Sequence, residues 1–69
     1  MDFCLKEDAE YIELIKLLKL CNIVDSGGQG KVLIEDGQVK VNGAVETRKK
    51  AKLRNGDRVE VLGKVIVIK

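Results

Sequence analysis

Histidine and tryptophan are absent from this sequence of 69 residues, and Phe3 and Tyr11 are its only aromatic residues. Without histidine, the chain lacks the side chain that most often performs general acid–base catalysis near neutral pH. A core without large aromatic side chains must be aliphatic, and in so short a chain it leaves little room for a deep substrate pocket. These absences argue against an enzyme such as a small hydrolase or transferase, and no cofactor is expected.

The glycine-rich stretch at residues 26–31 matches neither of the common nucleotide-binding motifs. A P-loop would need glycine where this sequence has Asp25, and serine or threonine where it has Val32. A dinucleotide fingerprint would need glycine where Leu33 stands. Both motifs also follow a strand, whereas this stretch follows an expected helix. Nucleotide binding is therefore not expected.

The two cysteines, Cys4 and Cys21, are far apart in the sequence. A zinc site takes about four ligands, which this chain cannot easily supply, so no metal is expected. We expect two reduced, apolar thiols in the core of a cytoplasmic protein; a single disulfide in a secreted chain is the alternative. No leader peptide is recognisable, and no apolar run approaches the roughly 20 residues that span a membrane.

The length of the chain predicts one domain over residues 1–69. A short apolar segment at residues 2–6 is expected to add an edge strand to a later sheet. The next segment, Glu7–Cys21, is predicted to be a helix with Asp8 as its N-cap, because acidic residues cluster at its start. Its core face should contain the apolar residues at helical spacing, which are Tyr11, Leu14, Ile15 and Leu18.

A second helix is predicted to begin at Ser26, because Ser26 followed by Gln29 forms a capping-box pattern. Its first turn contains three glycines within residues 27–30, each of which lowers helix propensity by roughly 0.8–1 kcal/mol relative to alanine. They imply either close packing against this turn or a ligand at its exposed N–H groups. Residues 32–34 should form the buried side, and Asp36-Gly37 should end the helix.

The second half of the chain is predicted to form strands joined by tight turns. Residues 38–41 alternate polar and apolar side chains, and Asn42-Gly43 then favours a type I′ hairpin, in which both central residues have positive φ. Two further strands are expected at residues 58–62 and 65–68, the last covered on both faces. The fold class is therefore α+β, with two short helices packed on a small antiparallel or mixed sheet.

Charge is distributed unevenly along the chain. Residues 1–37 contain four basic and eight acidic side chains, whereas residues 38–69 contain nine basic and three acidic ones. This asymmetry suggests a face that binds a polyanion; a lopsided charge that arises by chance is the alternative. Cations that neutralise phosphates release counterions and so give salt-sensitive affinity. The basic residues around the predicted hairpin are Lys40, Arg48, Lys49, Lys50, Lys52 and Arg54.

Polar groups at the start of the second predicted helix could add to this surface, because bare N–H groups there suit a phosphate oxygen. Each candidate also has a structural explanation: capping for Ser26 and Gln29, the turn for Asn42, and a solvated loop for residues 48–52. The chain has too few aromatic residues to stack single-stranded bases, and it has no evident major-groove recognition helix. Structured RNA is the favoured ligand. The candidate RNA-binding residues are Ser26, Gly27, Gln29, Lys31, Lys40, Asn42, Arg48, Lys49, Lys50 and Lys52.

Residues 37–43, with the sequence GQVKVNG, resemble the GxVxVNG core of the S-four-type RNA-binding domain, which is named after a small-subunit ribosomal protein. Together with the segments SGGQGK, ETRKK and NGD, they are similar to a stand-alone bacterial subfamily of that domain. The resemblance covers about residues 14–62. It implies the alpha-L RNA-binding motif, which in relatives grips ribosomal or transfer RNA and is often attached to tyrosyl-tRNA synthetase or pseudouridine synthases.

Carried over by position, the resemblance places Ser26, Lys31, Lys40 and Asn42 on the RNA-facing surface. Many members have arginine where this sequence has Gly27. The absence of arginine weakens one expected phosphate contact, so the basic residues at 48–50 are expected to contribute more of the binding.

The sequence therefore predicts a monomeric, non-catalytic protein that binds structured RNA, ribosomal or transfer RNA being favoured. Ribosome-associated proteins are candidate partners, and no membrane association is expected. The alternative is a protein-interaction adaptor that docks a partner through its acidic first helix and Leu20.

Overall fold

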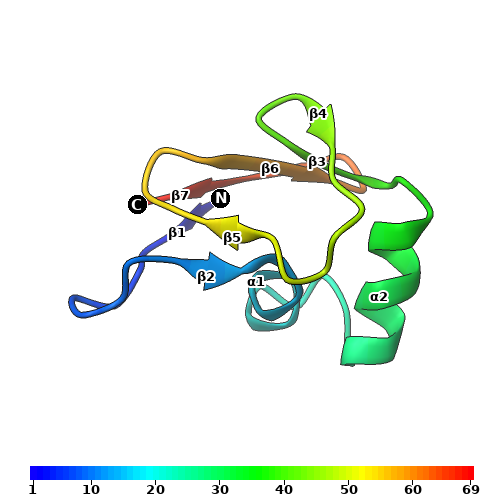
Figure 1. Ribbon diagram of the computed structural model, residues 1–69, viewed down its shortest axis with the longest axis horizontal. Coiled ribbons are helices and arrows are strands. Elements are labelled where there is room, and N and C mark those ends of the chain that lie inside the picture. The colour runs from blue at the N-terminus through cyan, green and yellow to red at the C-terminus, as the bar shows by residue number, and fades with distance from the viewer.

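The computed structural model describes residues 1–69 and consists of a five-stranded sheet with both helices against one of its faces (Figure 1). The order of strands in this sheet is β1-β7-β6-β3-β4, and β2 and β5 form a separate two-stranded ribbon. The elements in chain order are β1 (Asp2–Phe3), β2 (Ile12–Glu13), α1 (Leu14–Leu20), α2 (Gly27–Glu35), β3 (Val39–Val41), β4 (Ala44–Val45), β5 (Lys52–Leu53), β6 (Arg58–Val61) and β7 (Lys64–Ile68).

The five-stranded sheet is mixed, because β1 runs parallel to β7 at one edge while the other strand pairs are antiparallel. The predicted N-terminal edge strand is thereby confirmed. Asn42 and Gly43 have φ values of 53° and 85°, as the predicted type I′ turn between β3 and β4 requires. A second turn with positive φ at both residues, Leu62-Gly63, joins β6 to β7.

Helix α1 begins at Leu14 and is much shorter than the predicted helix from Glu7 to Cys21. The predicted N-cap, Asp8, lies in a turn before β2. Ile12 and Glu13 are not helical, because they pair antiparallel with β5, whose residues are distant in the sequence. This pairing overrides the local helical spacing.

The shorter helix changes its predicted core face. Leu14 and Leu18 are fully buried as expected, but Tyr11 precedes the helix and is 39% exposed. Leu17, which lay outside the predicted stripe, is fully buried.

Helix α2 begins and ends as predicted. The Ser26 hydroxyl accepts a hydrogen bond from the Gln29 N–H at 3.2 Å, and the Gln29 side-chain oxygen accepts one from the Asp25 N–H at 2.7 Å. Gly37, at φ 77°, follows the last residue of the helix and its cap. The predicted buried side is only partly correct, since Ile34 is buried but Val32 is 58% exposed.

Eleven aliphatic side chains form one core between the helices and the sheet. Strand β7 contributes Ile66 and Ile68, but Val65 is 42% exposed, so the prediction that both faces of this strand are covered was wrong. The expectation of two core thiols is only partly correct, because the half-buried Cys21 packs against the core but Cys4 is exposed. Both cysteines are free. Neither helix is long and apolar enough to cross a membrane.

Close packing leaves little room for a side chain at one of the three glycines of α2. A β-carbon at Gly30 would overlap the Ile15 δ1 methyl and lie 3.3 Å from the Val24 γ2 methyl, so this glycine lets the two helices approach closely. A β-carbon at Gly27 or Gly28 would meet open space.

We predict that Gly30→Val lowers the free energy of unfolding by about 1–3 kcal/mol, because the added methyl groups overpack the helix interface. The matched control, Gly28→Ala, should leave stability unchanged or raise it by up to about 1 kcal/mol through helix propensity. Denaturant unfolding measures both values. A Gly30→Val variant as stable as the parent would contradict this account of the interface.

Candidate nucleic-acid interface

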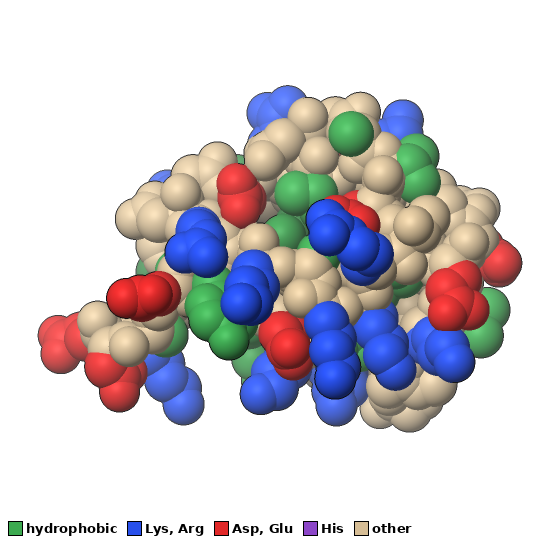
Figure 2. Space-filling view, viewed as in Figure 1, with side chains coloured by type: hydrophobic (Ala, Val, Ile, Leu, Met, Phe, Trp, Pro, Cys, Tyr) green, Lys and Arg blue, Asp and Glu red, His purple; other side chains and the backbone are tan.

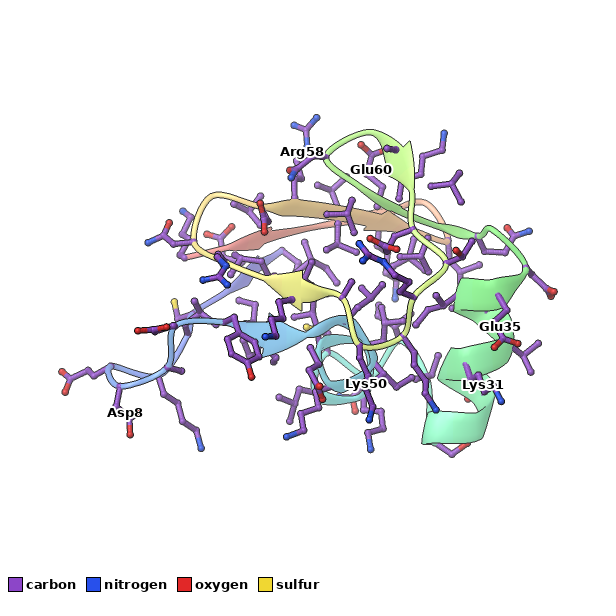
Figure 3. The ribbon with its side chains drawn as sticks, in the orientation of Figure 1. Asp8, Lys31, Glu35, Lys50, Arg58 and Glu60 are labelled. Carbon is purple, nitrogen blue, oxygen red and sulfur yellow. The ribbon has the colours of Figure 1, made fainter.

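Basic side chains gather in a band on the face of the molecule that shows α1, α2, β5 and the loop before β5 (Figure 2). We call this set the basic belt; all its members are exposed, and they are Lys31, Arg48, Lys49, Lys50, Lys52 and Arg54. Four of them, Arg48, Lys50, Lys52 and Arg54, line one shallow hollow of about 420 Å³. Lys31 on α2 and Lys50 on the loop lie on the same side of the molecule, whereas Arg58 and Glu60 lie on the opposite side (Figure 3).

The loop that carries Arg48, Lys49 and Lys50, half of the belt, is anchored through its backbone to the N-terminus of α1. The N–H groups of Leu14 and Ile15 donate to the carbonyls of Ala51 and Lys49, each at 2.9 Å. No side chain caps α1, so these carbonyls satisfy N–H groups that have no acceptor within the helix. Leu53 then enters the core at 1% exposure. The side chains of residues 48–50 and 52 are left free to face solvent.

Arg48 is held by an acidic neighbour that sequence reasoning missed. Its Nε and Nη2 atoms donate to the two carboxylate oxygens of Glu46 at 3.1 Å and 3.3 Å, and its backbone N–H donates to the same carboxylate at 3.1 Å. The hydrogen bonds from the Arg48 side chain, followed by those from its backbone, hold the pKa of Glu46 below its usual range. The signal in the sequence was the Glu-Thr-Arg spacing, which brings the two side chains to the same side of an extended chain.

Tyr11 is a second member of this region that the sequence did not single out for binding. The Lys52 ammonium lies 4.9 Å from the centroid of its ring, and the Arg54 guanidinium carbon lies 5.9 Å from it. Both distances fit cation–π contacts. Because Tyr11 comes from the segment just before β2, only the β2–β5 pairing could have revealed this arrangement.

The candidates at the start of α2 divide between two sides of the helix. Lys31 lies one turn after Gly27, so the two share a face, and the N–H of Gly27 has no acceptor within the helix. The side chains of Ser26 and Gln29 make the capping bonds described above. Gln29 also lines a different hollow, together with Val32 and other residues.

Lys40 and Asn42 do not join the basic belt. Lys40 lies opposite Glu60 in the sheet, and since its neighbours Val39 and Val41 turn toward the core, its side chain lies on the outer face. The amide of Asn42 is occupied internally: it donates to an Asp57 carboxylate oxygen at 3.0 Å and accepts from the Arg58 N–H at 2.9 Å. Asp57 also accepts from the Arg54 N–H at 2.8 Å. Asn42 thus links the β3–β4 turn to the turn before β6.

A larger hollow of about 520 Å³ lies beside the N-terminal segment. Six of its nine lining residues are apolar, among them Tyr11 and Leu20. The acidic residues that were predicted to start the first helix, including Glu7 and Asp8, instead lie in the loop before β2.

No group of three or more histidine, cysteine, aspartate or glutamate side chains is arranged to hold a metal ion.

Comparison with known proteins gives a consistent family signal. A family model described as the S4 domain matches residues 5–69. YbcJ of Escherichia coli (strain K12), provisionally named as an RNA-binding protein, is 51% identical over 53 residues, which cover 77% of this chain and 76% of YbcJ. RlbA of Bacillus subtilis (strain 168), provisionally named as a ribosome maturation protein, is 39% identical over 56 residues, or 81% of this chain and 79% of RlbA.

The three-dimensional fold is also similar to a solved one. The solution structure of E. coli YbcJ, described as containing an alpha-L motif involved in RNA binding, superposes with a TM-score of 0.70 at 43% identity. The match covers 97% of this chain and 84% of that one. The predicted fold, two short helices on a mixed sheet with the alpha-L motif, is confirmed.

We predict that Asn42 contributes to stability through its internal bonds. Asn42→Gly keeps the positive φ but removes both side-chain hydrogen bonds, and should lower the free energy of unfolding by about 1–2 kcal/mol. Asn42→Ala should cost about 1 kcal/mol more, because alanine is disfavoured at positive φ. Denaturant unfolding of both variants tests this. Equal stability of the Asn42→Gly variant and the parent would show that the two bonds contribute nothing.

The lowered pKa of Glu46 predicts a pH dependence. The stabilisation from its pairing with Arg48 should be complete above the ordinary pKa of glutamate and should be lost as the pH falls through the lower value of the folded protein. A carboxyl NMR titration should therefore find a Glu46 midpoint below that of unfolded glutamate, and Arg48→Gln should move it upward. A midpoint that is the same in both proteins would contradict the pairing.

Proposed function

This chain belongs to the S4 domain family, and from that membership we propose that it is a non-catalytic protein that binds structured RNA through the basic belt. The observation that carries the proposal is the concentration of six exposed basic residues on one face, three of them on a loop fixed by backbone bonds to α1. A rigid display of cations suits a ligand whose phosphates have a regular spacing. The free N–H of Gly27 beside Lys31 extends the same surface.

The composition of the surface favours folded RNA over a single strand. Single-strand binding usually depends on several aromatic side chains that stack on successive bases, and Tyr11 is the one exposed aromatic residue on this side of the molecule. Lysine and arginine contacts to phosphates instead read the backbone and shape of a helix. Affinity of this kind falls steeply with salt, because each neutralised phosphate releases counterions.

Ribosomal RNA is the ligand we favour within this class. The support is the similarity to RlbA, whose name refers to ribosome maturation, and the similarity to YbcJ, whose name refers to RNA binding. Such a ligand would place the protein in the cytoplasm, where it would act as a monomer. Lys40 and Asn42, which the sequence placed at the RNA surface, are left out of the proposed contact set because of their positions in the fold.

The hollow beside the N-terminal segment supports a second candidate function, a protein-interaction adaptor. It is mostly apolar and contains Leu20, which is 64% exposed. The docking surface would then be the hollow itself and not an acidic first helix. Pull-down before and after nuclease treatment separates the two functions, because partners that persist without RNA favour the adaptor and partners that vanish favour RNA binding.

We predict that the double change Lys49→Gln and Lys50→Gln weakens binding to a ribosomal RNA hairpin at least tenfold at moderate salt. The slope of log affinity against log salt should fall by about 2, because each lost phosphate contact removes about 0.9 from it. Both anchoring bonds of this loop use backbone atoms, so the fold should be unaffected. Filter binding across a salt series, with circular dichroism as a check of the fold, measures these effects.

The matched control is the double change Lys40→Gln and Arg58→Gln, which removes the same net charge from the outer face of the sheet. Lys40 and Arg58 both lie next to buried strand neighbours, Val39 and Val59, so their own side chains turn to that face. This control should retain most of the affinity of the parent. If the two double variants bind equally well, the belt is not the RNA surface, whatever RNA the protein binds.

A further inference from the structure

We propose that Glu46 is a positioning residue that fixes Arg48 so that the outer edge of its guanidinium binds a pair of acceptor atoms on the RNA. The inference rests on the proposed function, because it concerns one contact within the same surface. It assigns to Arg48 a role different from that of the neighbouring lysines, namely selection of a site on the RNA instead of general attraction.

The geometry of the pair leaves one edge of the guanidinium free. Arg48 uses Nε and one N–H of Nη2 to bind the Glu46 carboxylate side-on. A guanidinium has five N–H donors in a planar fork, so the Nη1 and Nη2 hydrogens of the outer edge remain unused. The side chain of Arg48 is 79% exposed, whereas that of Glu46 is only 19% exposed. The pair therefore presents the arginine and shields the carboxylate.

Glu46 is itself held in place from several directions. Its backbone N–H donates to the Val39 carbonyl at 3.0 Å, which fixes it beside β3. Its carboxylate also accepts from the backbone N–H of Arg48, so the loop and the side chain are oriented together. Such preorganisation reduces the side-chain entropy that Arg48 would lose on binding.

The ion pair also changes what Arg48 contributes electrostatically. The guanidinium and carboxylate together have little net charge, so the pair adds little to the counterion release that attracts RNA of any sequence. Arginine nevertheless matches two coplanar acceptors better than lysine does. Two sources on RNA supply such a pair: two oxygens of one phosphate, or the O6 and N7 atoms of an unpaired guanine.

The test compares the parent, Glu46→Gln, Arg48→Ala and the double variant on a ribosomal RNA hairpin with a guanine-containing loop, over a range of salt. Arg48→Ala should weaken binding roughly fivefold or more with little change in the salt slope. Glu46→Gln should weaken binding at high salt, because Arg48 is no longer held in place. It should also steepen the salt slope by up to about 1, because the unpaired guanidinium then neutralises a phosphate and releases counterions as a lysine would. In the Arg48→Ala background, Glu46→Gln should no longer weaken binding, and removal of the unpaired carboxylate should if anything strengthen it.

The control for the lost carboxylate is Glu60→Gln, which removes the same charge beside Arg58 on the outer face and should bind like the parent. A hairpin with 7-deazaguanine distinguishes the two sources. If it weakens the parent but not Arg48→Ala, the acceptors are on guanine; if it weakens neither, they are on a phosphate.

The inference is overturned if Glu46→Gln binds as tightly as the parent at every salt concentration, or if Glu46→Gln still weakens binding in the Arg48→Ala background. If instead the proposed function is wrong, the Lys49→Gln and Lys50→Gln double variant will bind the hairpin as tightly as the parent.

Discussion

Two backbone hydrogen bonds, from the N–H groups of Leu14 and Ile15 to the carbonyls of Ala51 and Lys49, hold the proposed interface together. They complete the N-terminus of α1, which no side chain caps, and they continue the short pairing of β2 with β5. The same contact therefore ends one strand, starts one helix and places the cationic loop. Leu53, buried immediately after the loop, fixes the chain on its far side. The position of the cationic loop is thus a consequence of how the first helix begins.

The two faces of the sheet separate residues that are close in sequence. Helices and core occupy one face, so alternate residues of β3 and β6 must turn to the other, where Lys40 lies opposite Glu60. The basic residues of the loop between β4 and β5 do not follow this alternation, because the loop crosses to the side of the sheet where the helices lie. Sequence proximity around the hairpin is thus a poor guide to which cations share a surface.

Features with a local cause were predictable from the sequence. The Ser26 cap with Gln29, the stop at Gly37 and the Asn42-Gly43 turn each depend on residues only a few positions apart, and the structure contains all three. The start of α1 was not predictable in this way, because β5, which competes for Ile12 and Glu13, lies far along the chain. The separation of Lys40 from the belt and the contact of Tyr11 with Lys52 likewise depend on how distant segments are arranged. The pairing of Glu46 with Arg48 has a local cause, the Glu-Thr-Arg spacing, and was therefore open to prediction.

The cationic loop is attached by main-chain atoms, which every amino acid shares. Folding and ligand binding therefore depend on different atoms of residues 48–52. The identities of the outward-facing side chains can vary in charge, length or shape without disturbing the attachment, while the half-buried Ala51 remains small beneath them. A scaffold of this kind can be adapted to a new ligand one side chain at a time, with no compensating change elsewhere in the chain.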